Sequence, residues 1–469
     1  MKFHDDGRVD KSAIGLLLLY AMCISTVVGI NHDILKEIKE HTEVAKQIID
    51  MAVYGKLQNQ SYNRLALFTD TFGNRIAGSK NLENSIDYIL SNLAKEGLEN
   101  VHGEPVKVPR WVRGNESAYL ISPRLQKLRL LGLGGSVGTP PSGITAEVIV
   151  VRSFEELHQK AAEAKGKIVV YNQPFVSYGK TVKYRDYGAG EASKVGGLAA
   201  LVRSITPYSI YSPHTGWKDH MDGVKPVPTA CITIEDAEML NRMYDRGTKL
   251  RIHLNMEAKN LPMTTSRNIV AEIVGREKPD EVVMFGGHID SWDVGKGAMD
   301  DGGGAFISWQ VLSLIKQLKL RPRRTLRMVM WTGEEPCICG GQEYFNRHKM
   351  NISKYNLVME SDLGTFRPIG INFTGNAQAY EIMKNVMQLM SPIGATKISP
   401  GYTGEDALFW VKAGVPGLSL NNDNRKYFYY HHSDGDTMTV QNPHEMNLCS
   451  ALWAVVAYTA ADLTEMLPR

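Results

Sequence analysis

Residues 281–318 read EVVMFGGHIDSWDVGKGAMDDGGGAFISWQVLSLIKQL, and the expected fold class follows from this stretch. It begins with an apolar run of strand length and ends with a longer apolar run that predicts a buried helix. Similar short apolar runs, each predicted to be a strand, occupy residues 267–275, 325–335 and 356–364. Because strands that alternate with helices form parallel crossovers, the sequence predicts an α/β fold with a mixed, largely parallel sheet sandwiched by helices.

The chain has 469 residues, more than one hydrophobic core usually supports, so two domains are expected. Residues 115–260 contain short apolar strands separated by Gly, Pro and Ser, with helical runs that include residues 190–205. We interpret this region as a smaller α/β domain inserted into a larger one formed by residues 46–114 and 261–469. A final run, residues 443–467, is apolar on most faces and predicts a buried helix.

The charge of the chain is balanced. It has 53 basic and 50 acidic residues, for a formal net charge of +3, and 43% of its residues are hydrophobic. A nucleic-acid or membrane-surface partner would require a basic patch, which this balance does not indicate. We therefore expect no nucleic-acid partner.

The beginning of the chain resembles a targeting segment. Basic residues precede an apolar run at residues 14–30, so residues 1–29 are predicted to be a cleaved signal peptide. The run is at the short edge of a membrane span, which makes an uncleaved anchor the alternative. Residues 30–45 are either a propeptide removed on activation or part of the first helix. After signal cleavage, we expect no stable membrane insertion.

Sequons and cysteines indicate the compartment. The sequence favours the secretory pathway, with secretion, the lysosome, the endoplasmic reticulum and the Golgi left open. The five cysteines are too few for a disulfide framework in a chain of this size. We expect either a bridge from Cys337 or Cys339 to Cys231 or Cys449, or two free thiols; two thiols do not fill a zinc site. Four sequons predict N-glycosylation, at Asn59, Asn115, Asn351 and Asn372.

Three of the four predicted strands end in residues that bind metals. His288 and Asp290 follow the first, Glu334 and Glu335 follow the second, and Asp362 follows the third. Since sites in open α/β sheets form beyond the carboxyl ends of strands, these side chains should converge at one edge. Imidazole and carboxylate ligands without thiolates favour catalytic zinc.

Two zinc ions need a shared carboxylate, and Asp300 is placed to bridge them because the glycines after it let the backbone pass close. Asp290 is expected to accept the free ring N–H of His288 and fix its tautomer. Glu335 can bind metal while Glu334 acts as the general base that takes a proton from water. The last ligand is either His431 or His432, which follow an aromatic run at residues 426–430, KYFYY, that we expect to be a strand.

The ordered motifs resemble those of the zinc aminopeptidase Y family. These motifs are H-x-D, then D-D-G twelve residues after that His, then E-E, E-S-D and H-S-x-x-D-T, and the resemblance extends over nearly the whole chain after the signal. The resemblance implies that His288 and Asp362 hold one zinc ion, that Glu335 and His432 hold the other, and that Asp300 bridges both.

Further properties are implied by the resemblance alone. It implies Glu334 as the base, a cis peptide at Asp300–Asp301, and a protease-associated fold for residues 115–260. It also implies hydrolysis of small peptide substrates, namely dipeptides with unblocked termini, and a homodimer. One departure concerns residues 336–341, PCICGG, where the family usually has a Gly-rich turn. This departure leaves substrate preference open.

Two other functions are compatible with the same fold. One is a catalytically silent receptor or scaffold, against which the intact ligand set argues. The other is a glutaminyl cyclase-like acyltransferase, which uses one zinc ion instead of two. For some acidic side chains the sequence leaves two possible roles open. Glu360 either supports the site or caps nearby structure, Asp406 either holds a substrate amine or shapes a turn, and Asp436 is expected to support His432.

Overall fold

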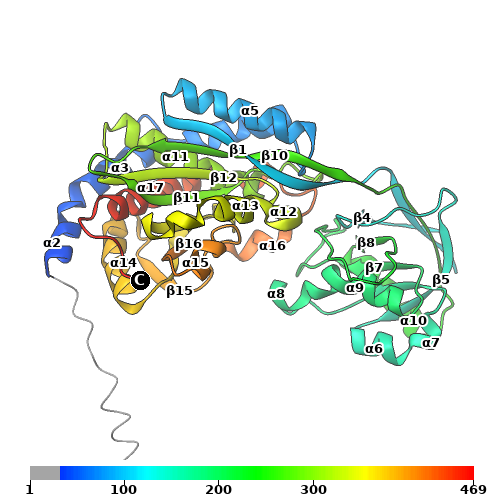
Figure 1. The fold of residues 1–469 in the computed structure, drawn as a ribbon. Coiled ribbons are helices and arrows are strands. Elements are labelled where there is room, and N and C mark those ends of the chain that lie inside the picture. Colours follow the sequence, from blue (N-terminus) through cyan, green and yellow to red (C-terminus); the bar gives the residue numbers. More distant parts are fainter. Residues whose placement is uncertain (1–31) are drawn as a thin grey trace, which may run out of the picture.

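The computed structural model describes residues 32–469, which form two lobes joined by a long two-stranded ribbon (Figure 1). The predicted signal peptide, residues 1–29, lies outside the described residues. The larger lobe is built on an eight-stranded sheet. Its strands, in spatial order, are β1 (Glu99–Val112), β10 (Lys259–Ile273), β12 (Arg324–Trp331), β11 (Lys278–His288), β13 (Tyr355–Glu360), β16 (Gly417–Asn422), β14 (Pro368–Thr374) and β15 (Lys397–Pro400).

The centre of this sheet is parallel, which confirms the predicted class. Strand β11 runs parallel to β12 and to β13, and β13 runs parallel to β16. Strand β10 pairs antiparallel with β12 and with β1, which makes the sheet mixed, as predicted. The reason is topological: the chain leaves the larger lobe along β1 and returns along β10, so the two strands must run in opposite directions.

Helices cover both faces of the sheet, as expected for strands that are buried on each side. One face packs against α3 (Thr42–Val53), α4 (Gln60–Phe72), α5 (Lys80–Lys95), α11 (Gly303–Gln317) and α17 (Pro443–Asp462). The other face packs against α13 (Cys339–His348) and α15 (Leu408–Lys412). Helix α17 is buried on nearly all sides, as its composition predicts.

The smaller lobe contains a second eight-stranded sheet. Residues 190–205, expected to be helical, divide at Gly196, whose φ of +79° ends the helix. The apolar residues that follow enter the sheet as a buried strand. The lobe consists of helices α6 (Phe154–Gln159), α7 (Ala161–Ala164), α8 (Tyr178–Thr181), α9 (Lys183–Lys194) and α10 (Ile234–Asp245) and strands β3 (Gln126–Leu128), β2 (Glu116–Ser122), β9 (Arg251–Met256), β5 (Ile144–Val151), β6 (Ile168–Tyr171), β7 (Ala199–Arg203), β8 (Thr229–Ile232) and β4 (Leu130–Gly132).

The segment suspected to be a propeptide packs on the larger lobe. Helix α2 (His32–Glu40) leads into α3, and the buried ring of His41 between them lies 3.0 Å from the carboxylate of Asp462 in α17. The carboxylate of Glu37 accepts hydrogen bonds from Thr464. None of these residues lines the pocket described below. Residues 32–45 therefore do not contribute to the lining of that pocket.

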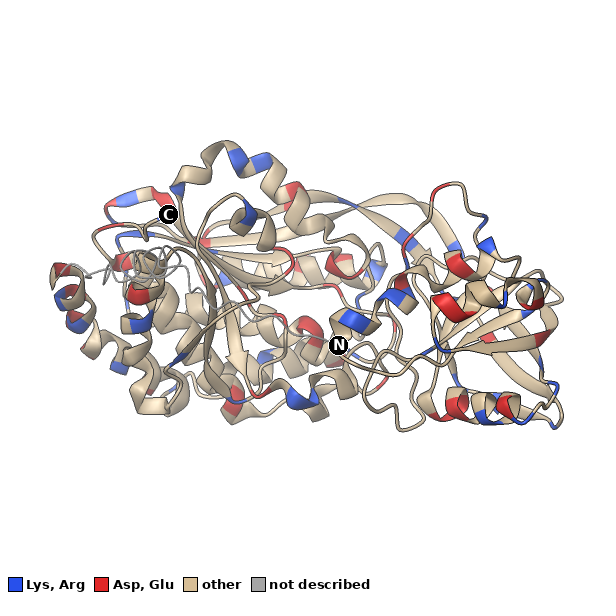
Figure 2. Ribbon diagram, turned by 90° about the horizontal axis from the view of Figure 1, so that it is seen from below, with Lys and Arg blue, Asp and Glu red and all other residues tan. Residues whose placement is uncertain are grey.

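The predicted glycosylation sites differ in accessibility. Asn115 and Asn351 are exposed, whereas Asn59 and Asn372 are half-buried. The side-chain oxygen of Asn59 accepts a bond from Asn447, and the amide of Asn372 donates to Ser419. Acidic and basic residues are interspersed over both lobes (Figure 2). Among residues 32–469, no helix has both the length and the apolarity required to cross a membrane.

Candidate active site

The predicted metal-binding residues meet at the carboxyl edge of the parallel strands. Strand β11 ends at His288, which is in register with the last residue of β12. The turn after β12 carries Glu334 and Glu335, and the loop after β13 carries Asp362. Two further segments reach this edge, the short helical turn η1 (Ala298–Gly302) and the loop after α16 (Tyr427–Tyr430).

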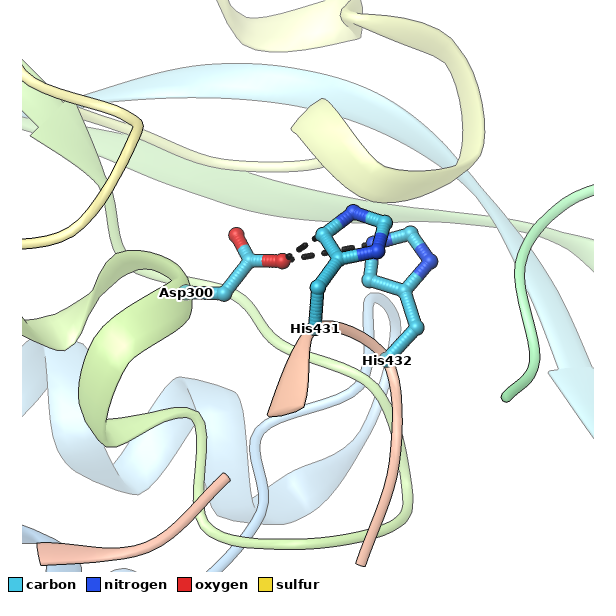
Figure 3. Close-up of side chains that lie close together, drawn as sticks. All are labelled: Asp300, His431 and His432. Atoms are coloured by element: carbon cyan, nitrogen blue, oxygen red, sulfur yellow. Dashed lines mark ion pairs between the residues drawn. The ribbon is translucent and has the colours of Figure 1, made fainter. Parts of the chain in front are cut away.

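Asp300 lies at the centre of the cluster. Its Oδ1 atom is 3.1 Å from Nε2 of His288, and its Oδ2 atom is 3.3 Å from Nε2 of His432. Figure 3 shows the carboxylate of Asp300 directed toward both His431 and His432. The two oxygens therefore face two separate groups of side chains.

Each group adds one more carboxylate. On one side, Oδ1 of Asp362 lies 3.3 Å from Nε2 of His288. On the other side, Oε2 of Glu335 lies 3.0 Å from Nε2 of His432. The structure thus brings together all five residues that the sequence analysis singled out as ligands.

The loop that carries Asp300 is held by other carboxylates. The side chain of Asp436 accepts hydrogen bonds from the backbone N–H groups of Met299 and Asp300, at 2.7 and 3.1 Å. Asp436 therefore supports the Asp300 loop and not His432, in contrast to our expectation. The Asp300–Asp301 peptide is cis, as the resemblance implies, and Asp301 accepts the backbone N–H of His288.

Asp290 is located as expected but makes a different contact. The Nδ1 atom of His288 lies 3.0 Å from the backbone carbonyl oxygen of Asp290 and 3.7 Å from its carboxylate. The carboxylate instead accepts the N–H groups of Gly333 and Glu334. Asp290 therefore fixes the His288 tautomer through its main chain, and its side chain holds the turn that bears Glu334.

Glu334 faces the cluster without belonging to either ligand group. Its Oε2 atom is 3.9 Å from Nε2 of His288, farther than the carboxylates of Asp300 and Asp362. Its side chain is 15% exposed, compared with 5% for Glu335. This partial exposure leaves the carboxylate within reach of the pocket.

The ambiguous acidic residues have structural contacts. Glu360 accepts the N–H groups of Asp406 and Ala407, the latter at 2.7 Å, so it caps neighbouring structure. Asp406 accepts the N–H of Gly341 at 2.6 Å and is fully buried, which fits a role in shaping the turn.

Two local predictions were wrong. Residues Tyr427–Tyr430 form the short helix α16, whereas we expected an aromatic strand; Tyr427 is buried and Phe428 lines the pocket. Cys337 and Cys339 form a disulfide with each other, where we expected partners elsewhere. The turn between them brings their Cα atoms to 5.0 Å, a separation that a disulfide spans. Cys231 and Cys449 are buried free thiols.

The inserted domain contributes to the site, which the sequence analysis missed. A cavity of about 630 Å³ opens over the cluster, and side chains from both lobes line it. The inserted domain supplies Tyr178, Arg185 and Trp217. Its backbone at Thr215 also bonds to His432, since the N–H of Thr215 donates to the His432 carbonyl oxygen at 2.8 Å. Backbone partners of this kind leave no signature in a sequence.

The electrostatics of the cluster favour a bound cation. Burial raises the pKa of Glu334 well above its ordinary value, and the charges of Asp362 and Glu335 act in the same direction. Burial would also raise the pKa of Asp300, but the neighbouring imidazoles of His288 and His432 hold it well below its ordinary value. Several carboxylates thus share a buried space with few positive charges, and a metal ion would balance them.

The donor set fits zinc. Three buried carboxylate oxygens, Oδ2 of Asp300, Oε1 of Glu335 and Oδ2 of Asp290, have no hydrogen-bond partner among the described residues. A buried, unpaired carboxylate oxygen is costly unless a metal or donor satisfies it. Imidazole nitrogens and carboxylate oxygens, with no thiolate, form the ligand set of catalytic zinc sites.

Known proteins resemble the whole of this architecture. Carboxypeptidase Q of Mus musculus is 58% identical over 445 residues, which cover 94% of this chain and 95% of the mouse protein. Carboxypeptidase Q of Xenopus laevis is 60% identical and covers 92% of each chain. The sequence profile of Peptidase family M28 matches residues 268–457. The chain belongs to peptidase family M28.

Membership of family M28 makes the chain a zinc metallo-exopeptidase, and the matched residues include the whole metal-binding cluster. A solved M28 peptidase precursor from Shewanella amazonensis shares 31% identity and a TM-score of 0.88 over 92% of this chain and 99% of its own. The zinc aminopeptidase BSAP from Bacillus subtilis, at 18% identity, has a TM-score of 0.65 over 88% of this chain and 99% of its own, and it supports the fold alone.

Proposed function

We propose that this M28 peptidase is a di-zinc enzyme that hydrolyses short peptides, in particular dipeptides with unblocked termini, to free amino acids. The observation that carries the proposal is the position of Asp300. Its two carboxylate oxygens face two separate groups, each with one imidazole and one further carboxylate. A shared carboxylate between two such groups is the arrangement that two-metal sites use.

In this proposal His288 and Asp362 hold one zinc ion, and Glu335 and His432 hold the other. Asp300 bridges the two ions. His431 also approaches Asp300, with its Nε2 atom 3.6 Å from Oδ2, but His432 is closer, at 3.3 Å, and its Nε2 atom also lies 3.0 Å from Glu335. The shorter distance to Asp300 and the contact with Glu335 support His432 as the ligand.

Zinc, when bound, polarises the scissile carbonyl and makes the attacking water more acidic. The carboxylate of Glu334 accepts a proton from that water as the water oxygen bonds to the scissile carbonyl carbon. It then donates the proton to the leaving amine as the C–N bond breaks. Asp290 positions Glu334 by accepting the N–H groups of the turn that carries it. The proposed ligands and Glu334 are largely buried, with side chains at most 15% exposed.

The shape of the site and the relatives support a small peptide substrate. The cavity of about 630 Å³ is of the size that holds small ligands. The curated relatives at 58% to 60% identity are named carboxypeptidases, which indicates release of a C-terminal residue. Removal of one residue from a dipeptide is consistent with both observations.

We further propose a homodimer and entry into the secretory pathway, ending in secretion or in the lysosome. The four sequons and the apolar run at residues 14–30 support export. Asn115 and Asn351 are the best placed of the sequons for glycosylation because their side chains are exposed.

Metal content and a dipeptide panel test the proposal together. We expect two zinc ions per chain and hydrolysis of several free dipeptides. One zinc ion per chain with cyclisation of an N-terminal glutamine would instead support the acyltransferase. Two zinc ions without activity on any dipeptide would support the silent receptor or scaffold.

A further inference from the structure

The wall of the active-site cavity carries a single cationic residue of the Lys or Arg type. Among the described residues that line the cavity, Arg185 is the only one, and it comes from helix α9 of the inserted domain. The rest of the lining is rich in carboxylates, with Asp186, Asp219, Asp300, Glu334, Glu335, Asp362 and Glu405. Apart from the proposed metal ions, Arg185 is therefore the part of this wall that would attract an anionic group of a ligand.

The Arg185 guanidinium is held in place by two neighbours, but not all of its N–H donors are engaged by them. Its Nη1 atom donates to the hydroxyl of Tyr178 at 2.8 Å, and its Nε atom lies 3.3 Å from the carboxylate of Asp186. Within residues 32–469, the other terminal nitrogen, Nη2, has no hydrogen-bond acceptor. The side chain is 11% exposed, so Arg185 is largely withdrawn from solvent yet still borders the cavity.

The backbone opposite Arg185 is shaped to receive it. Gly216 has a φ of +153°, and a Cβ atom at this position would lie 2.2 Å from Nη1 of Arg185. Any larger residue would therefore displace the guanidinium. Together with Tyr178, this glycine fixes the direction in which the guanidinium points.

A short chain of rings connects Arg185 to the metal-binding cluster. The ring of Tyr178, whose hydroxyl binds Arg185, packs edge-on against His431 with centroids 5.1 Å apart. His431 in turn stacks on His432 at 3.5 Å. Arg185 thus lies on the same wall as His432, two side chains away.

We propose that Arg185 binds the C-terminal carboxylate of the peptide substrate. This inference rests on the proposed function and adds to it the residue that selects for a free C-terminus. The planar guanidinium offers paired N–H donors that match a carboxylate. The inserted domain therefore supplies substrate recognition, while the larger domain supplies the metal ligands and the base.

The test compares each dipeptide with its C-terminal amide, which removes the charge and keeps the scissile bond. For the wild type we expect kcat/KM for the free acid to exceed that for the amide. In R185Q we expect kcat/KM for the free acid to fall by roughly 10- to 100-fold, since hydrogen bonds to charged groups carry that much binding energy. The kcat/KM for the amide should change little, so the ratio of kcat/KM for the acid to that for the amide should fall by the same factor.

Two variants complete the design. K180Q removes the same charge from the neighbouring helix α8, where Lys180 is exposed and does not line the cavity, and should keep the wild-type ratio. R185K keeps the charge but loses the paired N–H donors of the guanidinium, so it should reduce the acid-to-amide ratio of kcat/KM in part. If R185Q does not fold, R185K supplies the measurement instead.

An acid-to-amide ratio that stays at the wild-type value in R185Q or R185K would overturn the role of Arg185 while leaving the peptidase proposal intact. Failure of the wild type to hydrolyse either form would instead overturn the proposed function itself.

Discussion

Thr215 and His432 are joined by two hydrogen bonds across the domain boundary. The N–H of Thr215 donates to the carbonyl oxygen of His432 at 2.8 Å, and Nδ1 of His432 lies 3.2 Å from the carbonyl oxygen of Thr215. Because a carbonyl only accepts, Nδ1 must carry the proton, which leaves Nε2 free to bind metal. The inserted domain therefore fixes the tautomer and orientation of a proposed zinc ligand.

His214, next to Thr215 in the inserted domain, contacts the backbone beside His432, so its replacement tests whether this domain affects metal affinity. Its Nδ1 atom bonds to the carbonyl oxygen of His431 at 2.6 Å, and burial lowers its pKa to about 4, so the ring is neutral and donates. We expect H214A to weaken zinc retention by roughly 10- to 100-fold, as loss of a partner that orients a ligand does. Competition against a graded chelator measures this.

His220 provides the matched control for H214A. It lies in the same segment but is exposed. H220A should retain zinc as the wild type does. Equal zinc retention in H214A and H220A would show that the inserted domain does not position the metal site.

Arg75 is expected to be essential for stability. Its buried guanidinium donates to the carbonyl oxygens of Gly73, Ile289, Lys296 and Gly297, which hold the loop between His288 and Asp300. We expect R75M to lower the free energy of unfolding by about 3 kcal/mol or more, because each buried acceptor left unpaired costs about 1–3 kcal/mol. Urea unfolding measures the change. The exposed Arg110 provides the control, and an R75M loss no larger than that of R110M would refute this account.

The pairing of His41 with Asp462 predicts a pH window for stability. Burial would raise the pKa of Asp462, but hydrogen bonds from His41 and Arg276 lower it to about 2. Burial would lower the pKa of His41, but the bond to Asp462 raises it above its ordinary value. A carboxyl group whose pKa is lowered by folding stabilises the fold above its unfolded pKa of about 3.9. An imidazole whose pKa is raised by folding stabilises the fold below its unfolded pKa of about 6.5.

The contribution of this pair is thus largest between about pH 4 and pH 6.5. It is lost as the pH falls toward 2, and it declines as the pH rises through the raised pKa of His41. We expect D462N to lose roughly 1 kcal/mol of stability at pH 5 and less at pH 9. Urea unfolding of D462N and the wild type at both values measures it. If the difference in free energy of unfolding between D462N and the wild type is the same at pH 5 and pH 9, the His41–Asp462 pair does not make the expected contribution.

Much of the fold and most of the site follow from local sequence signals. The parallel centre of the sheet could be predicted because strands such as residues 281–288 are uniformly apolar, as strands buried on both faces must be. The convergence of His288, Glu335 and Asp362 follows from their positions just after those strands.

The remaining contacts depend on geometry that no local signal encodes. His432 has a backbone φ of +60°, and its Nε2 atom lies 3.0 Å from Glu335; neither feature can be read from two adjacent histidines in the sequence. The helical state of Tyr427–Tyr430 was missed because four aromatic residues have no distinguishing period. The partner of Asp436 lies more than a hundred residues away in the chain, so spacing could not identify it.

The central claim is that Glu334 is the general base of a di-zinc peptidase. Its most direct test measures kcat on a free dipeptide and zinc content for the wild type and E334Q. The control is E343Q, because Glu343 is partly exposed on α13. We predict that E334Q binds two zinc ions per chain but loses roughly 10²- to 10⁴-fold in kcat, the usual contribution of a general base, while E343Q matches the wild type. An E334Q enzyme that keeps both its zinc and full activity would contradict the account.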